Sequence, residues 1–213
     1  PPVTFNEQIG LCQDDNITGN VFNGDYDIEA GTVLTVNSVV VNPSHGTIVI
    51  NAAGDYTYTP YAGFYGTDVV VVSICDNGIP MPSACTNDTI FIDVNQRIPA
   101  DAGPDQILCS AYNTVLTGNW VVGTIGSWTQ LSGPNTAVIS PINNHYATVS
   151  GLTYGTYEFV YTLTSLYPTG NCSTSDTVVI TNYELPSASY AGPDQTLCLS
   201  GPSVSTNMAA NIP

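Results

Sequence analysis

Short runs in which apolar and polar residues alternate dominate the chain, and Gly, Pro, Asn and Asp separate them. Such alternation places every second side chain on the same face of an extended strand. No segment shows the i, i+3, i+4, i+7 apolar spacing of an amphipathic helix. We therefore predict an all-β chain, with strands at 33–41, 47–51, 55–59, 69–74, 89–94, 113–118, 126–131, 137–139, 147–149, 156–164 and 176–181.

An internal repeat sets the domain organisation. Ala-Gly-Pro-Asp-Gln-Ile-Leu-Cys at 102–109 returns as Ala-Gly-Pro-Asp-Gln-Thr-Leu-Cys at 191–198, a shift of 89 residues. That period is about the length of one small β-sandwich. Pro99 and Pro186 mark linkers, because the residue before a proline is restricted to extended conformations. The sequence predicts sandwich modules at 1–98 and 99–187, and the start of a further, truncated module at 188–213, in an extended array.

The charge balance excludes several classes of partner. Seventeen acidic residues face a single cation, Arg97, so the formal net charge is −16. Nucleic acid is excluded because phosphate binding needs a basic patch, and anionic lipid is disfavoured for the same reason. No apolar run reaches the roughly 20 residues that span a bilayer, and the first residues do not resemble a signal peptide. We expect a mature, secreted, soluble segment with no direct membrane insertion.

Cysteine usage indicates an oxidising compartment. The chain has six cysteines, no Cys-x-x-Cys pair and only two histidines, which favours disulfides over zinc ligation. Cys75 and Cys85 flank a loop at 76–84 that is rich in turn-forming residues. We therefore predict a bridge between them at the mouth of a hairpin.

A second bridge is predicted inside the second module. Cys109 and Cys172 bracket Trp128 in the Cys…Trp…Cys order of immunoglobulin sandwiches, in which a large apolar ring fills the interior around the bridge. The alternative is that these are two unrelated buried thiols. If they are bridged, Cys12 and Cys198 have no partner within the chain.

Five motifs of the first module, in this order, resemble the cadherin-like tandem repeats of large bacterial surface adhesins. They are Gly-Asn-Val-Phe-Asn-Gly-Asp-Tyr-Asp at 19–27, Leu-Thr-Val at 34–36, Pro-Ser-His-Gly-Thr-Ile at 43–48, Ala-Gly-Asp-Tyr-Thr-Tyr-Thr-Pro at 53–60 and Ala-Gly-Phe-Tyr-Gly-Thr-Asp at 62–68.

The second module is similar to the PKD-like, immunoglobulin-type repeats of Bacteroidota surface proteins. The resemblance runs from the 102–106 motif through Gly-Ser-Trp at 126–128 and Gly-Thr-Tyr-Glu-Phe at 155–159 to Asp-Thr-Val at 176–178. Together the two resemblances imply tandem immunoglobulin-like and cadherin-like sandwiches in a non-enzymatic adhesin at the cell surface, outside the outer membrane. They also imply a gliding-motility type of adhesin that meets the type IX secretion and anchoring machinery, neighbouring modules of its own chain, and a glycan or protein ligand. Two alternatives stay open: carbohydrate-binding accessory modules of a secreted hydrolase, and a subunit of an extracellular filament.

Carboxylates of the first module are candidate ligands for calcium, which takes six to eight oxygens. Asp25 and Asp27 place two carboxylates on one side of an extended segment, as in a cadherin-like ligand loop. The full candidate set is Asp14, Asp15, Asp25, Asp27 and Asp76. The alternative is that these are ordinary turn residues that accept hydrogen bonds from their own backbone.

Asp-Thr-Ile at 88–90 and Asp-Thr-Val at 176–178 resemble the O-glycosylation sequon of Bacteroidota, which implies sugars on Thr89 and Thr177. The alternative is that threonine is simply common in strands. Arg97 is a candidate partner for Asp101 or Asp105 across the linker, but we favour the interpretation that these are solvated turn aspartates, because exposed ion pairs contribute little.

Catalytic patterns are not apparent. His45 and His145 each lie in a turn-like segment with no nucleophile motif nearby, so we expect no enzyme. A cluster of aromatic residues surrounds one predicted hairpin. Tyr56 and Tyr58 share one face of a strand and are interpreted as core, whereas Tyr61 and Tyr65 beyond it are candidate contacts for a glycan.

Overall fold

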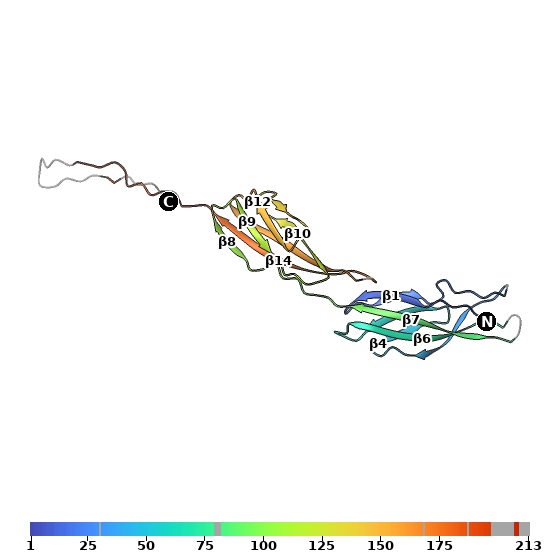
Figure 1. Cartoon of the computed structure of the whole chain (residues 1–213). Coiled ribbons are helices and arrows are strands. Elements are labelled where there is room, and N and C mark those ends of the chain that lie inside the picture. The colour runs from blue at the N-terminus through green and yellow to red at the C-terminus, as the bar shows by residue number, and fades with distance from the viewer. Residues whose placement is uncertain (30, 79–81, 168, 187, 197–206, 209–213) are drawn as a thin grey trace.

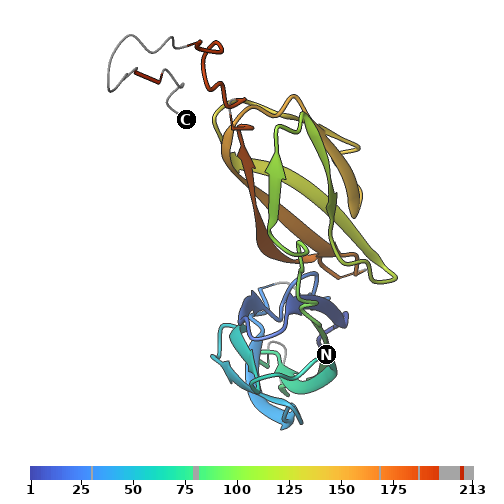
Figure 2. The same ribbon diagram turned by 90° about the vertical axis from the view of Figure 1, so that its left-hand side faces the viewer.

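A computed structural model describes residues 1–29, 31–78, 82–167, 169–186, 188–196 and 207–208. This part of the chain forms fourteen β-strands arranged in four sheets. Within it, no helix has the length and hydropathy needed to cross a bilayer. Figure 1 shows two β-sandwiches arranged end to end, and Figure 2 shows the same pair turned by 90°. The predicted all-β sandwich fold is confirmed.

Module 1 packs a four-stranded sheet on a three-stranded sheet. In the larger sheet the first strand pairs in parallel with the last, and all other pairs in the module are antiparallel. In sheet order, the strands are β1 (Glu7–Cys12), β7 (Cys85–Asn95), β6 (Gly66–Cys75) and β3 (Thr35–Val41), against β2 (Ile17–Asn20), β5 (Asp55–Pro60) and β4 (Gly46–Ile50).

Alternation along these strands produces the core of module 1. Val70, Val72 and Ile74 of β6 are fully buried, and Tyr56 and Tyr58 of β5 pack in the same cluster. The two tyrosines thus belong to the core, as the spacing predicted. Burial of such side chains contributes about 1.5–3 kcal/mol each to folding.

Asp68 is a buried anchor at the start of β6. One carboxylate oxygen accepts a hydrogen bond from the Ser44 amide at 2.8 Å, and the other accepts from the His45 amide at 2.9 Å and from the Tyr58 hydroxyl at 3.0 Å. Burial alone raises the pKa of Asp68, but these hydrogen bonds outweigh burial and hold the pKa below its usual value. The carboxylate therefore ties the loop before β4 to the core.

We expect Asp68→Ala to destabilise the chain by about 2–4 kcal/mol, because it leaves the buried Tyr58 hydroxyl and two amides without a partner. Asp93→Ala is the matched control, since the Asp93 carboxylate accepts only exposed hydrogen bonds from Thr67 and Gln8 and its loss should cost under about 1 kcal/mol. Urea unfolding monitored by tyrosine and tryptophan fluorescence measures both. Equal losses in the two variants would contradict the anchoring role.

Module 2 repeats the same plan. Its larger sheet again pairs the first strand in parallel with the last. In sheet order, the strands are β10 (Thr124–Ser132), β13 (Gly155–Ser165), β14 (Cys172–Tyr183) and β8 (Gln106–Cys109), against β11 (Val138–Ser140), β12 (Tyr146–Ser150) and β9 (Asn113–Thr117).

Trp128 and Tyr161 occupy the centre of the module 2 core, with ring centroids 4.7 Å apart and no exposed surface. The Tyr161 hydroxyl donates a hydrogen bond to the Asn119 carbonyl at 2.6 Å. Glycine is required beside this ring, because a Cβ on Gly126 or Gly118 would lie 2.2 or 2.4 Å from its atoms. Module 2 therefore closes around an aromatic pair rather than around a disulfide.

Every strand predicted from the alternation is present, with ends shifted by a few residues. The prediction missed β1, β2 and β8. β2 and β8 have only four residues each, and β1 and β2 each contain a glycine, so these strands lack a clear pattern of their own. Pairing with a neighbouring strand holds each of them in place.

Candidate functional site

A disulfide joins the two modules covalently. Cys12 is the last residue of β1 in module 1, and Cys172 is the first residue of β14 in module 2. Their sulfurs are bonded, their Cα atoms lie 5.7 Å apart, and 160 residues separate them in the sequence. The bond thereby fixes the end of β1 in module 1 to the start of β14 in module 2. We call this region, residues 10–13 and 95–98 with residues 167 and 169–174, the module junction.

The predicted Cys109–Cys172 bridge is wrong. Cys109 pairs in register with Tyr183, the last residue of β14, whereas Cys172 is the first residue of that strand. At about 3.3 Å per residue the two cysteines stand more than 30 Å apart, far beyond the span of a disulfide. Cys109 is instead exposed with a free thiol. The predicted Cys75–Cys85 bridge is present, across the ends of β6 and β7.

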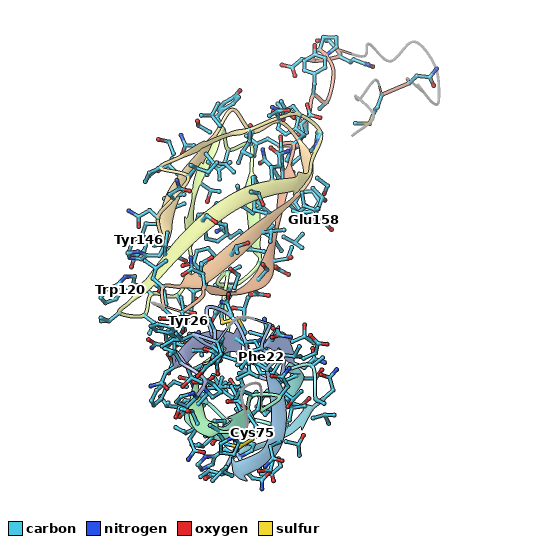
Figure 3. The ribbon with its side chains drawn as sticks, turned by 90° about the vertical axis from the view of Figure 1, so that its right-hand side faces the viewer. Phe22, Tyr26, Cys75, Trp120, Tyr146 and Glu158 are labelled. Carbon is cyan, nitrogen blue, oxygen red and sulfur yellow. A yellow bond between two sulfur atoms is a disulfide. The ribbon has the colours of Figure 1, made fainter. Side chains whose placement is uncertain are left out.

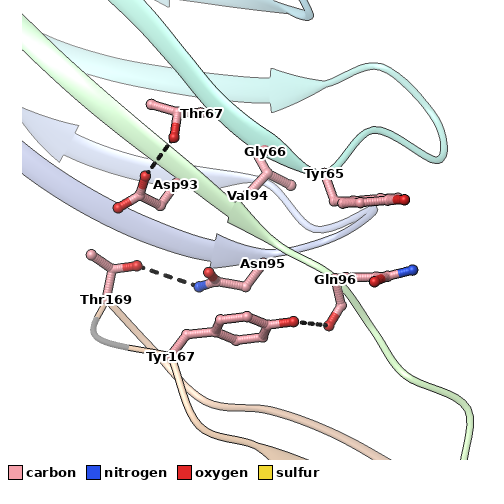
Figure 4. Close-up of a pocket in the computed structure, with 9 residues that line it drawn as sticks. All are labelled: Tyr65, Gly66, Thr67, Asp93, Val94, Asn95, Gln96, Tyr167 and Thr169. Carbon is pink, nitrogen blue, oxygen red and sulfur yellow. Dashed lines mark hydrogen bonds between the residues drawn. The ribbon is translucent and has the colours of Figure 1, made fainter. Parts of the chain in front are cut away.

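Hydrogen bonds reinforce the module junction. The Asn95 side-chain amide donates a hydrogen bond to the Thr169 hydroxyl at 3.4 Å, and the Tyr167 hydroxyl donates one to the Gln96 carbonyl at 3.3 Å (Figure 4). The same amide also donates to the Gly170 carbonyl at 3.4 Å. Beside these contacts the two modules enclose an open cleft of about 360 Å³, which Tyr65 also lines. Residues from both sandwiches thus form one continuous surface.

Gly10 permits the close approach of the modules. A Cβ atom at this position would lie 2.3 Å from the Thr169 carbonyl oxygen. That distance is shorter than any contact between non-bonded atoms, so a side chain here would push module 2 away from β1. The glycine at position 10 therefore allows β1 to lie directly against Thr169 of module 2.

Arg97 stabilises the junction from the linker. Its guanidinium forms an ion pair with Asp15 at 2.6 Å, donates to the Gln13 carbonyl at 3.0 Å and reaches the Ser173 carbonyl at 3.4 Å. Arg97 does not pair with Asp101 or Asp105, because its side chain turns back towards the end of β1. Asp101 instead accepts a hydrogen bond from the Gly103 amide, and Asp105 accepts one from the Val179 amide.

Three carboxylates form a second group, which we call the acidic cluster: Glu7 of β1, Asp25, and Asp88 of β7. Asp88 has no exposed surface. One oxygen of Asp25, one of Asp88 and both of Glu7 are buried and accept no hydrogen bond from a donor group. Glu7 and Asp88 lie close enough to share a hydrogen bond when one of them carries a proton. Buried oxygens without a partner destabilise a fold unless a proton or a cation neutralises them.

The pKa values in the acidic cluster follow from this burial. Burial, and then the adjacent Asp88 carboxylate, raise the pKa of Glu7 to about 8. Burial raises the pKa of Asp88 to about 6, and the charge of Asp25 adds to the rise. Burial also raises the pKa of Asp25. The three groups therefore cannot all carry a negative charge without a large electrostatic cost.

The donor chemistry of the acidic cluster fits calcium, which prefers carboxylate oxygens. Across the described residues, however, no three His, Cys, Asp or Glu side chains already converge as metal ligands. Asp27 lies two residues from Asp25 with a side chain that is only 1% exposed. Its Oδ2 and the Glu29 Oε2 accept no hydrogen bond, but each lies 3.9 Å from the amino group of Pro1. These two extend the set of oxygens on the same segment.

The five aspartates predicted as calcium ligands do not form one site. Asp14 and Asp15 follow Cys12 at the end of β1. Glu7 lies at the start of β1, five residues before Cys12 and therefore about 17 Å from it. Asp14 accepts the Gly63 amide, and Asp15 pairs with Arg97. The Asp76 carboxylate accepts hydrogen bonds from the Ala84 and Gly78 amides. These bonds hold the loop before β7 and lower the pKa of Asp76. Only Asp25 and Asp27 keep buried oxygens that lack a hydrogen-bond partner.

The two candidate glycosylation sites occupy equivalent strands. Thr89 lies six residues before the end of β7, and Thr177 lies six residues before the end of β14. The Thr177 side chain is exposed, whereas Thr89 is half-buried beside Asp88. Modification of these threonines stays a prediction.

Exposed aromatic rings occur on both modules. Tyr61 and Tyr65 are each 55% exposed, as their interpretation as surface residues required. A more prominent group lies on module 2, where Trp120 is 59% exposed next to His145 and Tyr146 (Figure 3). Trp120 and His145 border a cleft of about 300 Å³ that Asn143 and Asn144 also line. The sequence analysis did not single out this group, although a tryptophan followed by two valines in a loop is a detectable signal.

Comparison with known proteins agrees with this architecture. Residues 1–96 match the family model described as "Bacterial cadherin-like domain". No curated protein matches the chain.

Several solved structures are similar to parts of the chain. The PKD domain from the KIAA 1837 protein shares 31% identity over 42% of this chain and 91% of its own, with a TM-score of 0.34. A SusE-like surface-located polysaccharide-binding protein from Bacteroides thetaiotaomicron shares 12% identity over 85% of this chain, with a TM-score of 0.40. Drosophila N-cadherin EC1-4 shares 14% identity over 85% of this chain, with a TM-score of 0.34. The chain spans 34% of the second structure and 50% of the third.

Sequence reasoning missed the residues that now matter most. The sequence prediction gives Cys12 no partner because it assigns Cys172 to Cys109, whereas the structure bonds Cys172 to Cys12. Glu7 and Asp88 were missed as a pair because only the parallel pairing of β1 with β7 brings them together.

Proposed function

We propose that the chain is a non-enzymatic, stiff segment of a large repetitive cell-surface adhesin, held outside the outer membrane, where it projects and contacts a target. The observation that carries this proposal is the covalent module junction. A disulfide, a close glycine contact and hydrogen bonds from both sides hold one sandwich against the next. Fixed joints between modules favour a rod, whereas the default between domains is free relative motion.

The proposed partners follow from the same architecture. Neighbouring modules of the same chain are the first partner. Export and anchoring by the type IX secretion machinery, and a role in gliding or surface attachment, are supported by the resemblance of the modules to Bacteroidota adhesin repeats. The disulfides support an oxidising, extracellular location.

Calcium is proposed as a ligand of module 1. Glu7, Asp25 and Asp88 would hold it, with Asp27 and Glu29 as further donors. When bound, the ion supplies positive charge to buried oxygens that accept no hydrogen bond. The match of residues 1–96 to the bacterial cadherin-like family model and the buried oxygens of the acidic cluster support this assignment.

Small-angle X-ray scattering tests the rod. We expect the maximum dimension of the particle to equal that of two sandwiches end to end and to stay constant with protein concentration. After reduction, or in Cys12→Ser, the particles should adopt a broader range of dimensions, because the two modules can then move relative to each other. The Cys75→Ser/Cys85→Ser variant, which removes a bridge inside one hairpin, should keep the original profile. Growth of the particle with concentration would contradict the proposal and favour a filament subunit.

Module 2 offers a candidate adhesive surface. Trp120 presents an exposed ring beside His145 and the Asn143 and Asn144 amides, and such rings stack on sugar faces while amides bond to hydroxyls. This observation favours a glycan over a flat protein partner.

We expect Trp120→Ala to weaken binding on a glycan array at least about tenfold, because the loss of a stacked ring costs on the order of 1.5 kcal/mol. Tyr65→Ala, an equally exposed ring on module 1, is the control and should leave binding unchanged. Binding that falls with Tyr61→Ala or Tyr65→Ala instead would place the surface on module 1. Retained binding in Trp120→Ala would exclude this site.

A further inference from the structure

Cys109 of module 2 occupies the same structural position as Cys12 of module 1. Each cysteine is the last residue of its module's first strand, and that strand pairs in parallel with the module's last strand. Cys12 is in register with Asn95 and Cys109 with Tyr183, the final residues of β7 and β14. The residue after each cysteine donates its amide to that final residue's carbonyl at 2.8 Å. The two thiols are therefore equivalent, yet only Cys12 is bonded.

The position of Cys172 shows which partner such a cysteine takes. Cys172 begins the last strand of module 2, as Cys85 begins the last strand of module 1. Cys85 faces Cys75 across its hairpin and bonds to it, whereas Cys172 faces Ser165, whose hydroxyl donates to the Cys172 carbonyl. Because serine stands opposite, Cys172 is available to the preceding module, and it bonds Cys12.

The surface beside Cys109 lacks the cover that its counterpart has. Asn95, the register partner of Cys12, is 7% exposed because module 2 packs over it. Tyr183, the register partner of Cys109, is 56% exposed. The end of module 2 thus presents, uncovered, the same face that module 1 buries in the module junction.

We propose that Cys109 forms a repeating inter-module disulfide with the following module. It bonds the cysteine that begins the last strand of that module, which the 89-residue repeat places about 150 residues further along. The partner is a second sandwich of the module 2 type, whose start the repeat at 191–198 marks. Cys198 is the next copy of the same cysteine, and its structure lies outside the described residues. The bond forms by thiol–disulfide exchange: two thiols lose two protons and two electrons to the disulfide form of a thiol oxidoreductase, which becomes a dithiol.

A tandem variant tests this proposal: residues 1–187 followed directly by a second copy of residues 99–187, folded with glutathione disulfide as the oxidant. It holds seven cysteines. We expect bonds Cys12–Cys172 and Cys75–Cys85, a third bond from Cys109 of the first copy to Cys172 of the second copy, and one titratable thiol per chain under denaturing conditions. Three thiols per chain, or a bond between the two cysteines of the second copy, would overturn the proposal.

Two variants of the tandem chain separate pairing from chance oxidation. Cys109→Ser in the first copy should raise the thiol count from one to two. Ser165→Cys in the second copy should divert its Cys172 into a hairpin bridge and leave Cys109 of the first copy reactive.

If the tandem chain does not fold, the full-length protein, alkylated before unfolding and digested without reduction, decides the question. A Cys109 peptide linked to the cysteine that begins the last strand of the next module supports the proposal, and an alkylated or Cys198-linked Cys109 overturns it. The inference rests on the proposed function only in treating the chain as a tandem array, and these thiol measurements are independent of adhesion.

Discussion

Single-molecule pulling on residues 1 and 213 should release several hundred ångströms more chain when the Cys12–Cys172 bridge is removed. With the bridge intact, force passes along residues 1–12, through the disulfide, and out along residues 172–213. Residues 13–171, which include most strands of both modules, lie outside that path. At roughly 3.5 Å per residue, up to about 550 Å of contour length stays hidden.

The Cys12→Ser/Cys172→Ser variant should therefore extend by about this additional length, and a reducing agent should do the same to the parent chain. Cys75→Ser/Cys85→Ser is the matched control. Its bridge closes a separation of only 10 residues inside the hidden segment, so its removal should leave the extension of the otherwise oxidised chain unchanged. Equal extension in all variants would show that the modules are not joined through Cys12. The bridge should also stabilise the chain by on the order of 4–5 kcal/mol in the chain-entropy model.

Calcium should stabilise module 1 most strongly at neutral and mildly alkaline pH. Without a cation, the free energy of unfolding should fall as pH rises from about 5 to 8, because the raised pKa values of Glu7 and Asp88 mean that the folded state binds more protons than the unfolded state. The expected loss is on the order of 1–3 kcal/mol. Millimolar calcium, which takes the place of the protons, should restore the lost stability at pH 8.

Glu7→Gln and Asp88→Asn should each abolish most of the calcium response and flatten the pH dependence. Asp105→Asn in module 2 removes one charge away from the acidic cluster and should keep both responses. Chemical unfolding in buffers of controlled calcium, read by circular dichroism, measures all three. A calcium response that survives Asp88→Asn would place the ion elsewhere, and pH-independent stability would exclude charge burial at Glu7.

The sequence predicted most of the sheet framework and little of the site. Alternation located β6, β7, β13 and β14 because these strands bury every second residue, so the pattern and the structure have the same cause. It missed β1 and β8, whose pairing depends on a distant strand rather than on their own pattern.

The cysteine pairing failed for a related reason. Cys109, Trp128 and Cys172 have the order of an immunoglobulin domain, but order along the chain does not give the position along a strand. The register puts Cys109 opposite Tyr183, eleven residues from Cys172. Likewise, Asp25 was identified by its local motif, whereas Glu7 and Asp88 become neighbours only when the first and last strands pair.

Tryptic cleavage under non-reducing conditions tests the covalent junction most directly. Arg97 is the single Lys or Arg in the chain, so trypsin cuts once, between module 1 and module 2. The chain is alkylated, unfolded, digested and weighed before and after reduction. We predict that the fragments 1–97 and 98–213 stay joined until a reducing agent separates them. Fragments that separate without reduction would show that Cys172 bonds within module 2 or not at all, and would contradict the covalent junction.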